Sequence, residues 1–170
     1  MSLLTLRPSE PDDLDFIIAA EQHPDNRSWI IPYSRDQHLQ VMRNNDILHA
    51  VLEQKTDGDV GFIMLAGLND PNDSLEFRRI VITEKRKGYG RAALKQVQQL
   101  AFEEKNVHRL WLDVKVENRR ARSLYKSEGF TEDGLLRESL KTGNGYESLV
   151  IMSMLRHEYF ETNDHKPNQL

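Results

Sequence analysis

Residues 80–93 read IVITEKRKGYGRAA, an apolar strand that passes through a basic, glycine-containing turn into a helix. The first N–H groups of a helix lack intrahelical partners and carry a positive partial charge, so they form a ready site for phosphate. Gly88 and Gly90 let the backbone approach an anion without a Cβ in the way. Four cations surround the same point, and the turn as a whole comprises Lys85, Arg86, Lys87, Gly88, Tyr89, Gly90 and Arg91. This stretch predicts a phosphorylated ligand, with a pyrophosphate as the best fit.

Two familiar phosphate-binding motifs compete for this stretch. A P-loop requires Gly-x-x-x-x-Gly-Lys-[Ser/Thr], which the chain lacks. The dinucleotide fingerprint fits Gly88-x-Gly90-x-x-Ala93, with Asp113 near the expected distance. Against that fingerprint, five polar residues separate the strand from the first glycine, and the motif follows a meander of hairpin strands. The plainest alternative is a helix start with a basic surface cluster that binds nothing.

The rest of the chain alternates strand-like and helix-like segments on both sides of this turn. Apolar runs bounded by turn residues predict seven strands, at residues 3–6, 47–53, 60–68, 75–83, 109–114, 135–140 and 146–155. Helical periodicity and N-terminal signals predict four helices, at residues 10–21, 34–44, 88–104 and 118–127. Residues 24–32 begin and end with proline and are expected to be irregular. This order predicts a mixed α/β (α+β) domain with both hairpins and crossover helices.

The composition is that of one globular domain. The chain has 170 residues, of which 38% are apolar and 29% charged, and no apolar run approaches the roughly 20 residues of a membrane helix. It has no cysteine, which excludes disulfides, thiolate metal sites and cysteine nucleophiles. We see no secretory signal, and the six histidines show no ligand spacing, so we expect a cytoplasmic protein without a metal. Residues 1–158 are expected to form the domain, and residues 159–170 a polar, frayed tail.

Charge is distributed unevenly along the chain. The net charge is −4, but residues 1–70 carry 12 acidic and 5 basic side chains, whereas residues 71–140 carry 11 acidic and 15 basic ones. The first segment therefore suits a cationic ligand and the second an anionic one. The overall negative charge argues against nucleic acid as the main partner. Surface charge without a specific purpose explains the asymmetry equally well.

A second constellation lies at residues 117–130, which read ENRRARSLYKSEGF. Asn118, Ala121 and Tyr125 are spaced i, i+3 and i+7, so they share one face of the predicted helix. A small residue between an amide and a phenol leaves room for a ligand along that face. On spacing alone, a core tyrosine whose hydroxyl is satisfied by the backbone is favoured.

Together, the two constellations resemble the GNAT acetyltransferase superfamily. The resemblance is carried by Lys85-x-x-Gly88-x-Gly90 and by Asn118-x-x-Ala121-x-x-Leu124-Tyr125-x-x-x-Gly129-Phe130, and the order of elements agrees from about residue 3 to 155. Residues 108–138 are similar to spermidine acetyltransferases and to ribosomal-protein N-terminal acetyltransferases. The resemblance implies a central mixed, mostly antiparallel sheet of about seven strands, flanked by about four helices. It implies an N-acetyltransferase that uses acetyl-CoA and no metal.

The resemblance also assigns the acetyl-CoA site. In the family, the turn from Lys85 to Arg91 binds the CoA pyrophosphate through backbone amides. The preceding strand, here from Arg79 through Ile80, Val81 and Ile82, binds the pantetheine arm through its main chain. Asn118 corresponds to a further pantetheine contact, and Ala121 lies on the same helix face. The arginines at positions 119, 120 and 122 are candidates for the 3′-phosphate, with a solvated helix face as the alternative.

Two side chains receive catalytic roles from the resemblance. Tyr125 corresponds to the general acid that protonates the departing CoA thiolate. Glu76 matches a position where the family often has a carboxylate, which makes it a candidate base for the amine proton. The alternatives are a water chain as the base and, for Glu76, a surface ion pair with Arg78. An N–H of the Arg79–Ile82 strand is the candidate oxyanion donor.

The acceptor is less well defined by the sequence. The family builds this site from the segment between the first two helices and from the last hairpin; here the segment contains Asn26, Trp29, Ile31 and Tyr33, with Glu76 as a further candidate. The acidic first third suits a small-molecule polyamine or a peptide N-terminus. We expect no membrane partner, and a homo-oligomer is compatible with the family. The competing functions are a CoA-binding module without catalysis, a nicotinamide enzyme, and an adaptor that uses the basic cluster.

Overall fold

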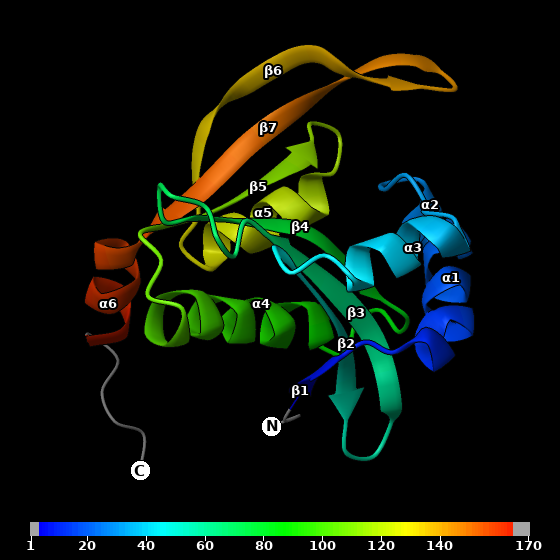
Figure 1. Cartoon of the computed structure of the whole chain (residues 1–170). Coiled ribbons are helices and arrows are strands. Elements are labelled where there is room, and N and C mark those ends of the chain that lie inside the picture. The colour runs from blue at the N-terminus through cyan, green and yellow to red at the C-terminus, as the bar shows by residue number, and fades with distance from the viewer. Residues whose placement is uncertain (1–3, 165–170) are drawn as a thin grey trace. The chain divides into compact units, whose positions relative to one another are not determined.

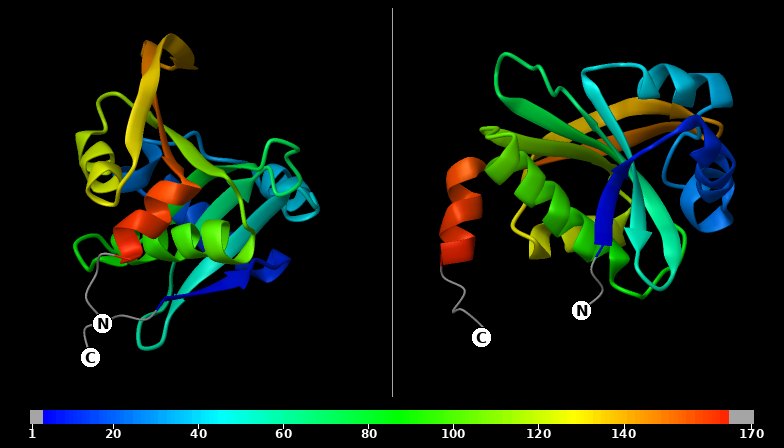
Figure 2. Two further views of the ribbon diagram at one scale, coloured as in Figure 1. Left: turned by 90° about the vertical axis from the view of Figure 1, so that its left-hand side faces the viewer. Right: turned by 60° about the horizontal axis from the view of Figure 1, so that its bottom comes forward.

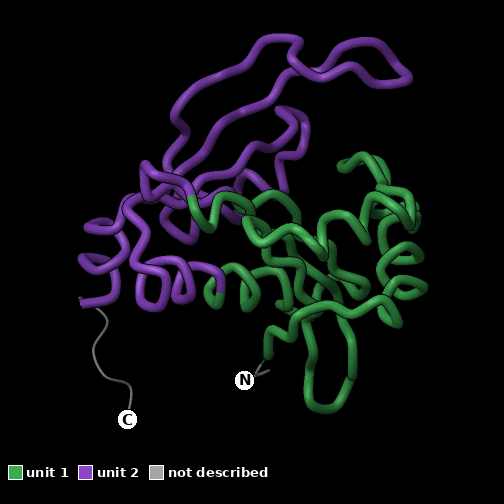
Figure 3. The backbone as a smooth tube through the Cα atoms, in the orientation of Figure 1, with its two compact units in different colours: residues 1–69, 77–96 green, residues 70–76, 97–170 purple. Residues whose placement is uncertain are grey.

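The computed structural model describes residues 4–164. These residues form two compact units (Figure 3). Unit 1 contains residues 4–69 and 77–96, and unit 2 contains residues 70–76 and 97–164. The expectation that residues 1–158 behave as one domain stays a prediction.

The strands of unit 1 form an antiparallel meander. β1 (Leu4–Pro8) pairs with β2 (Ile47–Gln54), and β2 pairs with β3 (Gly58–Ala66). Both views of Figure 2 show β2 and β3 side by side, joined by the turn at residues 55–57. The register shifts between Leu52 and Glu53, which marks a bulge near that turn. β4 (Ser74–Ile82) belongs to both units, because its first three residues lie in unit 2 and the rest lie in unit 1.

Helices connect these strands. A single 3₁₀ turn (Pro11–Asp13) leads into α1 (Leu14–Gln22), and α3 (Arg35–Met42) begins at an N-cap, Ser34, whose hydroxyl accepts a hydrogen bond from the Gln37 amide at 3.2 Å. α4 (Tyr89–Gln99) follows β4. The expectation that residues 24–32 are wholly irregular is wrong, because α2 (Pro24–Arg27) forms one turn there. His23 caps this turn by accepting from the Asp25 amide at 3.2 Å, and proline is favourable at the first helical position.

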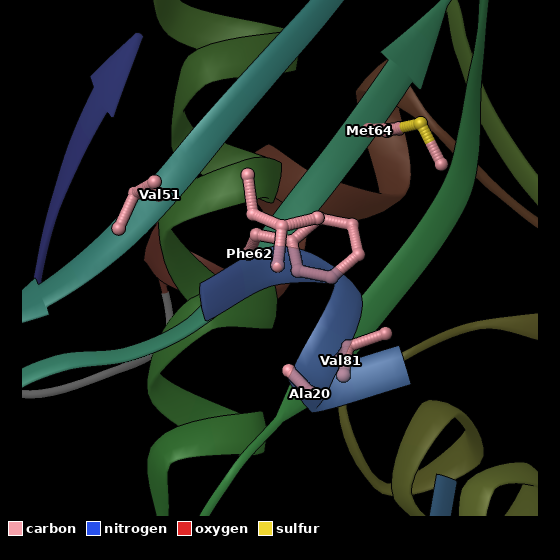
Figure 4. Packing of buried hydrophobic residues seen from close by; sticks show 6 residues of the cluster. Ala20, Val51, Phe62, Met64 and Val81 are labelled. Atoms are coloured by element: carbon pink, nitrogen blue, oxygen red, sulfur yellow. The ribbon is translucent and has the colours of Figure 1, made fainter. Parts of the chain in front are cut away.

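The core of unit 1 packs α1 against the sheet. Ile17 and Ala20 of α1 contact side chains of β2, β3 and β4, and Figure 4 shows this packing from close by. The buried cluster comprises Ile17, Ala20, Val51, Phe62, Met64 and Val81. Burying an aliphatic or aromatic side chain of this size contributes about 1.5–3 kcal/mol, so this cluster holds α1 against the sheet.

Unit 2 is built around a second set of strands. β5 (Arg109–Lys115) pairs in parallel with Ser74–Glu76 of β4 and antiparallel with β7 (Gly145–Leu155). β6 (Thr131–Thr142) forms a long hairpin with β7 (Figure 1), and its register shifts twice along the pair. α5 (Arg119–Ser127) connects β5 to β6, and a π-helical turn (Leu100–Glu104) continues α4.

The expected fold class is confirmed. The strands form a seven-stranded mixed sheet in the order β1-β2-β3-β4-β5-β7-β6, and the central segment runs from β4 into α4 as the sequence predicted. The described residues contain six α-helices where about four were expected. The two additions are α2 and α6 (Arg156–Asp164), and α6 corrects the prediction of a frayed tail because it buries Tyr159. Residues 165–170 of that predicted tail lie outside the described residues.

Candidate functional site

The turn between β4 and α4 keeps its backbone open where the sequence predicted phosphate binding. It covers residues 83–88, and α4 begins at Tyr89. Gly88 has a φ of 79°, and a Cβ added there would meet nothing within 4 Å. Arg86 also adopts a left-handed conformation, with a φ of 66°. At the other end, the Thr83 amide donates to the Val60 carbonyl at 3.0 Å, which ties the turn to β3. The N-terminus of α4 is therefore preceded by a shaped and accessible loop.

The turn's cations do not all remain available, because acidic side chains already engage one of them. The Lys87 ammonium contacts Glu84 at 2.5 Å and Asp57 at 3.0 Å. The Tyr89 hydroxyl donates to the same Asp57 carboxylate. These hydrogen bonds from Tyr89 and Lys87 hold the pKa of Asp57 below its ordinary value. Sequence reasoning missed Asp57, since it reaches the turn only because the β2–β3 hairpin folds back.

Lys85 serves as an anchor for the turn. Its ammonium donates to the Asn26 side-chain oxygen at 2.5 Å and to the Ile82 carbonyl at 3.0 Å. Asn26 is buried, and its side-chain nitrogen donates to the Ala20 carbonyl at 2.9 Å and to the Ile82 carbonyl at 3.3 Å. Asn26 therefore joins the end of α1 to the end of β4, and its contact with the acceptor stays a prediction. The remaining cations of the turn, Arg86 and Arg91, are exposed.

The strand that leads into the turn is held tightly against β3. Val81 and Ile82 are buried, and Ile80 is half-buried. A Cβ at Gly61 would lie only 2.1 Å from the Val81 carbonyl oxygen, so the two backbones approach too closely for any side chain at that position. This contact fixes the main chain of the Arg79–Ile82 stretch, for which the sequence predicted a role in binding pantetheine.

The expected acceptor segment is partly exposed. Trp29 is 42% exposed and Ile31 52% exposed, so this segment presents apolar side chains at the surface. Tyr33 is half-buried, and the Arg79 guanidinium lies 4.2 Å from its ring centroid. Tyr33 also borders a shallow hollow along α3, lined by Tyr33, Gln37, Gln40, Val41 and Asn44. Trp29 and Tyr33 thus belong to a surface that can meet a ligand.

A buried cluster of ionisable side chains lies next to this segment, and the sequence analysis missed it. It consists of Glu21, His38, His49 and Arg79, which come from α1, α3, β2 and β4. Burial, with a contribution from His38, lowers the pKa of His49 to about 4. Two features of the sequence could have indicated this cluster: Glu21 lies on the buried side of a predicted helix, and His49 lies within an apolar predicted strand.

In unit 2, Tyr125 of α5 is buried with a free hydroxyl. Burial, reinforced by the negative charge of Asp113, raises the pKa of Tyr125 to about 12. Its ring packs 5.9 Å from that of Phe130, and no group of residues 4–164 hydrogen-bonds its hydroxyl. A protonated, unengaged hydroxyl is suited to donating a proton. The alternative of a core tyrosine satisfied by backbone does not describe this residue.

The start of α5 differs from the expectation. Asn118 is the N-cap and not part of the helix, and its side-chain oxygen accepts from the Ala121 amide at 3.3 Å. Only Ala121 and Tyr125 therefore share a helix face as predicted. The Arg122 guanidinium donates to Glu132 at 2.8 Å and to the Val116 carbonyl at 2.9 Å, so its place is structural.

Glu76 is the other predicted catalytic residue in unit 2. It is half-buried on β4 and lies in register with Trp111 of β5. The predicted site residues therefore divide between the units. Unit 1 holds Trp29, Tyr33, Ile80, Val81, Ile82, Lys85, Arg86, Lys87, Gly88, Tyr89, Gly90 and Arg91, and unit 2 holds Glu76, Asn118, Ala121 and Tyr125. Within residues 4–164, no group of three or more His, Asp or Glu side chains is placed to hold a metal ion. No helix in the described range is both long and apolar enough to span a membrane.

Comparisons with known proteins agree with these features. The model of the acetyltransferase (GNAT) domain matches residues 4–131. A spermidine N(1)-acetyltransferase from Vibrio cholerae is 29% identical over 171 residues, which cover 96% of this chain and 99% of the relative. The structure of a V. cholerae spermidine N-acetyltransferase in complex with CoA and spermine superposes with a TM-score of 0.83 at 30% identity, and the match covers 92% of this chain and 98% of that one. An Escherichia coli [ribosomal protein bS18]-alanine N-acetyltransferase is 38% identical, but over 41% of this chain and 46% of its own length.

Proposed function

Because this chain belongs to the GNAT acetyltransferase family, we propose that it transfers the acetyl group of acetyl-CoA to a primary amine of a polyamine. Acetyl-CoA-dependent N-acetyltransfer is the activity for which its relatives are named. The observation that carries the proposal is the match, over nearly the whole of both chains, with an enzyme whose structure holds CoA and spermine.

Unit 1 supplies the groups that would hold acetyl-CoA. The open backbone at Gly88 and the N-terminus of α4 fit a diphosphate. The main chain of Ile80, Val81 and Ile82 would bind the pantetheine arm, and the Gly61 contact supports this role because it fixes that main chain. The Lys87 ammonium would exchange its contacts with Asp57 and Glu84 for phosphate oxygens, while Lys85 and Asn26 keep the turn in place.

The reaction is attack of a neutral amine on the thioester carbonyl, which forms an amide and releases the CoA thiol. Tyr125 would donate its proton to the departing sulfur. A pKa of about 12 keeps this hydroxyl protonated at neutral pH, and its lack of a hydrogen-bond partner within the described chain leaves the proton available. Asn118 supports the same face by fixing the first turn of α5, which positions Ala121 and Tyr125.

A base must take the proton of the amine, since primary amines have a pKa near 10 and are mostly charged at neutral pH. Glu76 is the candidate for this step, either directly or through water. It is half-buried and carried by a paired strand, which holds its backbone in a fixed position. Glu76→Gln tests this role. The rate of acetyl transfer falls if Glu76 is the base, and it is unchanged if a water chain that does not involve Glu76 takes the proton.

The acceptor is proposed to be a polyamine. The first 70 residues carry a net charge of −7, from 12 acidic and 5 basic side chains, which suits a polycation. The exposed side chains of Trp29 and Ile31 offer apolar surface for the methylene groups between its amines. A peptide N-terminus is the second candidate, supported by the shorter match to the [ribosomal protein bS18]-alanine N-acetyltransferase.

We also infer that the chain self-associates. A structure of the V. cholerae spermidine N-acetyltransferase in an intermediate state is dodecameric, and it superposes on 96% of this chain with a TM-score of 0.79. Light scattering of the purified protein, with and without spermine, tests this inference.

The direct experiment measures release of the CoA thiol from acetyl-CoA across a panel of amines. The panel contains spermidine, spermine, a lysine analogue and a peptide with an N-terminal alanine. We expect turnover with the polyamines. Turnover with the peptide alone would favour the second candidate. CoA binding without thiol release on any amine would identify a CoA-binding module without catalysis, and NAD binding without CoA binding would identify a dinucleotide protein.

A further inference from the structure

The cluster of Glu21, His38, His49 and Arg79 in unit 1 has no role in the proposed acetyl transfer. Glu21 and His38 are fully buried, His49 is 4% exposed, and the side chain of Arg79 is 8% exposed. Removing ionised groups such as Glu21 and Arg79 from water costs several kcal/mol each, and an apolar packing of similar volume is often at least as stable. The cluster is therefore poorly explained as a source of stability alone.

Every member of the cluster is hydrogen-bonded to another. The Arg79 guanidinium donates to one Glu21 oxygen, and His38 bonds through Nε2 to the other. His38 Nδ1 lies 3.1 Å from His49 Nε2, and His49 Nδ1 lies 2.8 Å from the Ser9 hydroxyl. Arg79 pairs with the charge of Glu21. With His38 donating to Glu21, His49 donates to His38 and accepts from Ser9, which leaves no ring nitrogen unpaired.

The ion pair also holds the acceptor segment. A second nitrogen of Arg79 donates to the Ile31 carbonyl at 2.8 Å, and the guanidinium lies 4.2 Å from the ring centroid of Tyr33. The Tyr33 amide donates to Glu21 at 3.4 Å. Residues 28–34 contain no helix or strand. The contacts with Arg79 and Glu21 therefore hold this segment in place of the backbone hydrogen bonds of a helix or sheet.

We propose that Arg79 is a positioning residue that fixes the segment Ile31–Tyr33 in the conformation that binds the amine. This inference rests on the proposed function for the identity of the amine. Arg79 also begins the stretch proposed to bind pantetheine, so one side chain joins the binding elements of both substrates. A planar guanidinium can bond to Glu21 and to the Ile31 carbonyl at once while stacking on Tyr33. A lysine could meet only part of this pattern.

Three variants separate positioning from stability. Arg79→Met leaves the Glu21 carboxylate buried without its cation, so it is expected to lower stability as well as amine binding. The double variant Glu21→Gln/Arg79→Met removes both charges and is expected to recover much of the stability. Arg79→Lys keeps the positive charge but cannot donate to Glu21 and to the Ile31 carbonyl in the fixed geometry of a planar guanidinium. If Arg79 positions the segment, all three raise the KM for spermidine, by about tenfold or more in the two methionine variants, while kcat changes by less than about threefold.

Arg7 provides a matched control in the same unit. Its guanidinium also bonds to carboxylates, at 2.9 Å from both Asp13 and Glu53, but it makes no contact with residues 31–33. Arg7→Met is expected to lower the midpoint of urea unfolding without changing the KM for spermidine. A KM that recovers in the double variant together with stability would overturn the proposal, because the ion pair would then act only through the fold.

Amide hydrogen exchange gives a readout that does not depend on turnover. In both variants that contain Arg79→Met, exchange at Tyr33 and its neighbours is expected to become at least about tenfold faster, whereas Arg7→Met leaves it unchanged. An unchanged exchange rate in the double variant would contradict the inference even if no amine in the panel were acetylated. A wild-type protein that acetylates no amine contradicts the proposed function instead, so the two failures are distinguishable.

Discussion

In unit 1 a chain of hydrogen bonds runs from the partly buried Ser9 through His49 and His38 to Glu21 and Arg79. In unit 2 the ring of Tyr125 is largely buried, and its hydroxyl bonds to no group of the described residues. The first arrangement is closed and holds main-chain segments in place. The second keeps a proton donor available at the cost of leaving it without a protein partner. The proposed roles follow this difference: the groups proposed to bind the substrates lie in the hydrogen-bonded unit 1, and the proposed proton donor lies in unit 2.

The largest expected effect concerns the Tyr125 hydroxyl, which has no hydrogen-bond partner in the described residues. Tyr125→Phe removes the proposed general acid, and losses of about 10²–10⁴ in kcat are typical for that role. Stability is expected to change by less than about 0.5 kcal/mol, because the hydroxyl makes no hydrogen bond that the substitution would break. Thiol release and urea unfolding measure the two quantities.

Tyr159→Phe is the matched control within unit 2. Its hydroxyl donates to Glu103 at 2.5 Å, and burial raises the pKa of Tyr159 above its ordinary value. We expect this variant to keep its kcat and to lose about 1 kcal/mol of stability. A kcat for Tyr125→Phe equal to that of wild type would remove Tyr125 from its assigned role.

The next effect concerns the hydrogen-bonded cluster of unit 1. Burial lowers the pKa of His49 from 6.5 to about 4, so the unfolded chain binds this proton more readily than the folded one. The contribution of His49 to stability is therefore complete above pH 6.5 and declines as the pH falls toward 4. Between pH 7 and pH 5 the wild type should lose about 2 kcal/mol more than His49→Gln, as measured by urea unfolding at each pH. Parallel pH profiles for the two proteins would show that His49 is not held neutral.

The smallest effect concerns the acid that faces the turn of unit 1. Asp57 holds Lys87 and Tyr89, and its charge opposes an incoming phosphate. Asp57→Asn is expected to tighten CoA binding by about two- to threefold at low salt, with the gain shrinking as salt increases. Asp59→Asn removes the same charge two residues away, where the carboxylate lies 3.7 Å from Arg7, and should have no effect. Weaker CoA binding by Asp57→Asn would mean that Asp57 supports the turn more than it opposes phosphate.

The fold could be predicted from the sequence because its signals are local. Alternating apolar runs and the Gly-containing turn at residues 83–88 specify β4 and α4 without reference to the rest of the chain. Tyr125 was placed on α5 for the same reason. The short helix α2 was missed because the prolines at residues 24 and 32 favoured an irregular segment, whereas Pro24 occupies the first position of a helix, where proline is tolerated.

The buried cluster could not be predicted, because its members meet only after folding. Glu21 and Arg79 are separated by 58 positions, and His38 and His49 by 11. Glu21 follows Ile17 by four positions on the buried stripe of α1, which marks it as a buried carboxylate but names no partner. The sequence therefore indicates which groups are unusual, and only the fold shows how they are paired.

The central claim is that the turn of unit 1 binds the diphosphate of CoA, and titration calorimetry with CoA tests it most directly. Gly88→Val places a branched side chain on the open face at a φ of 79°, which should weaken CoA binding by about tenfold or more. Gly145→Val, at another positive-φ glycine with open space around it, is the control and should bind as wild type. Absence of heat when the wild type is titrated with CoA or acetyl-CoA, or equal affinity in Gly88→Val, would contradict the account.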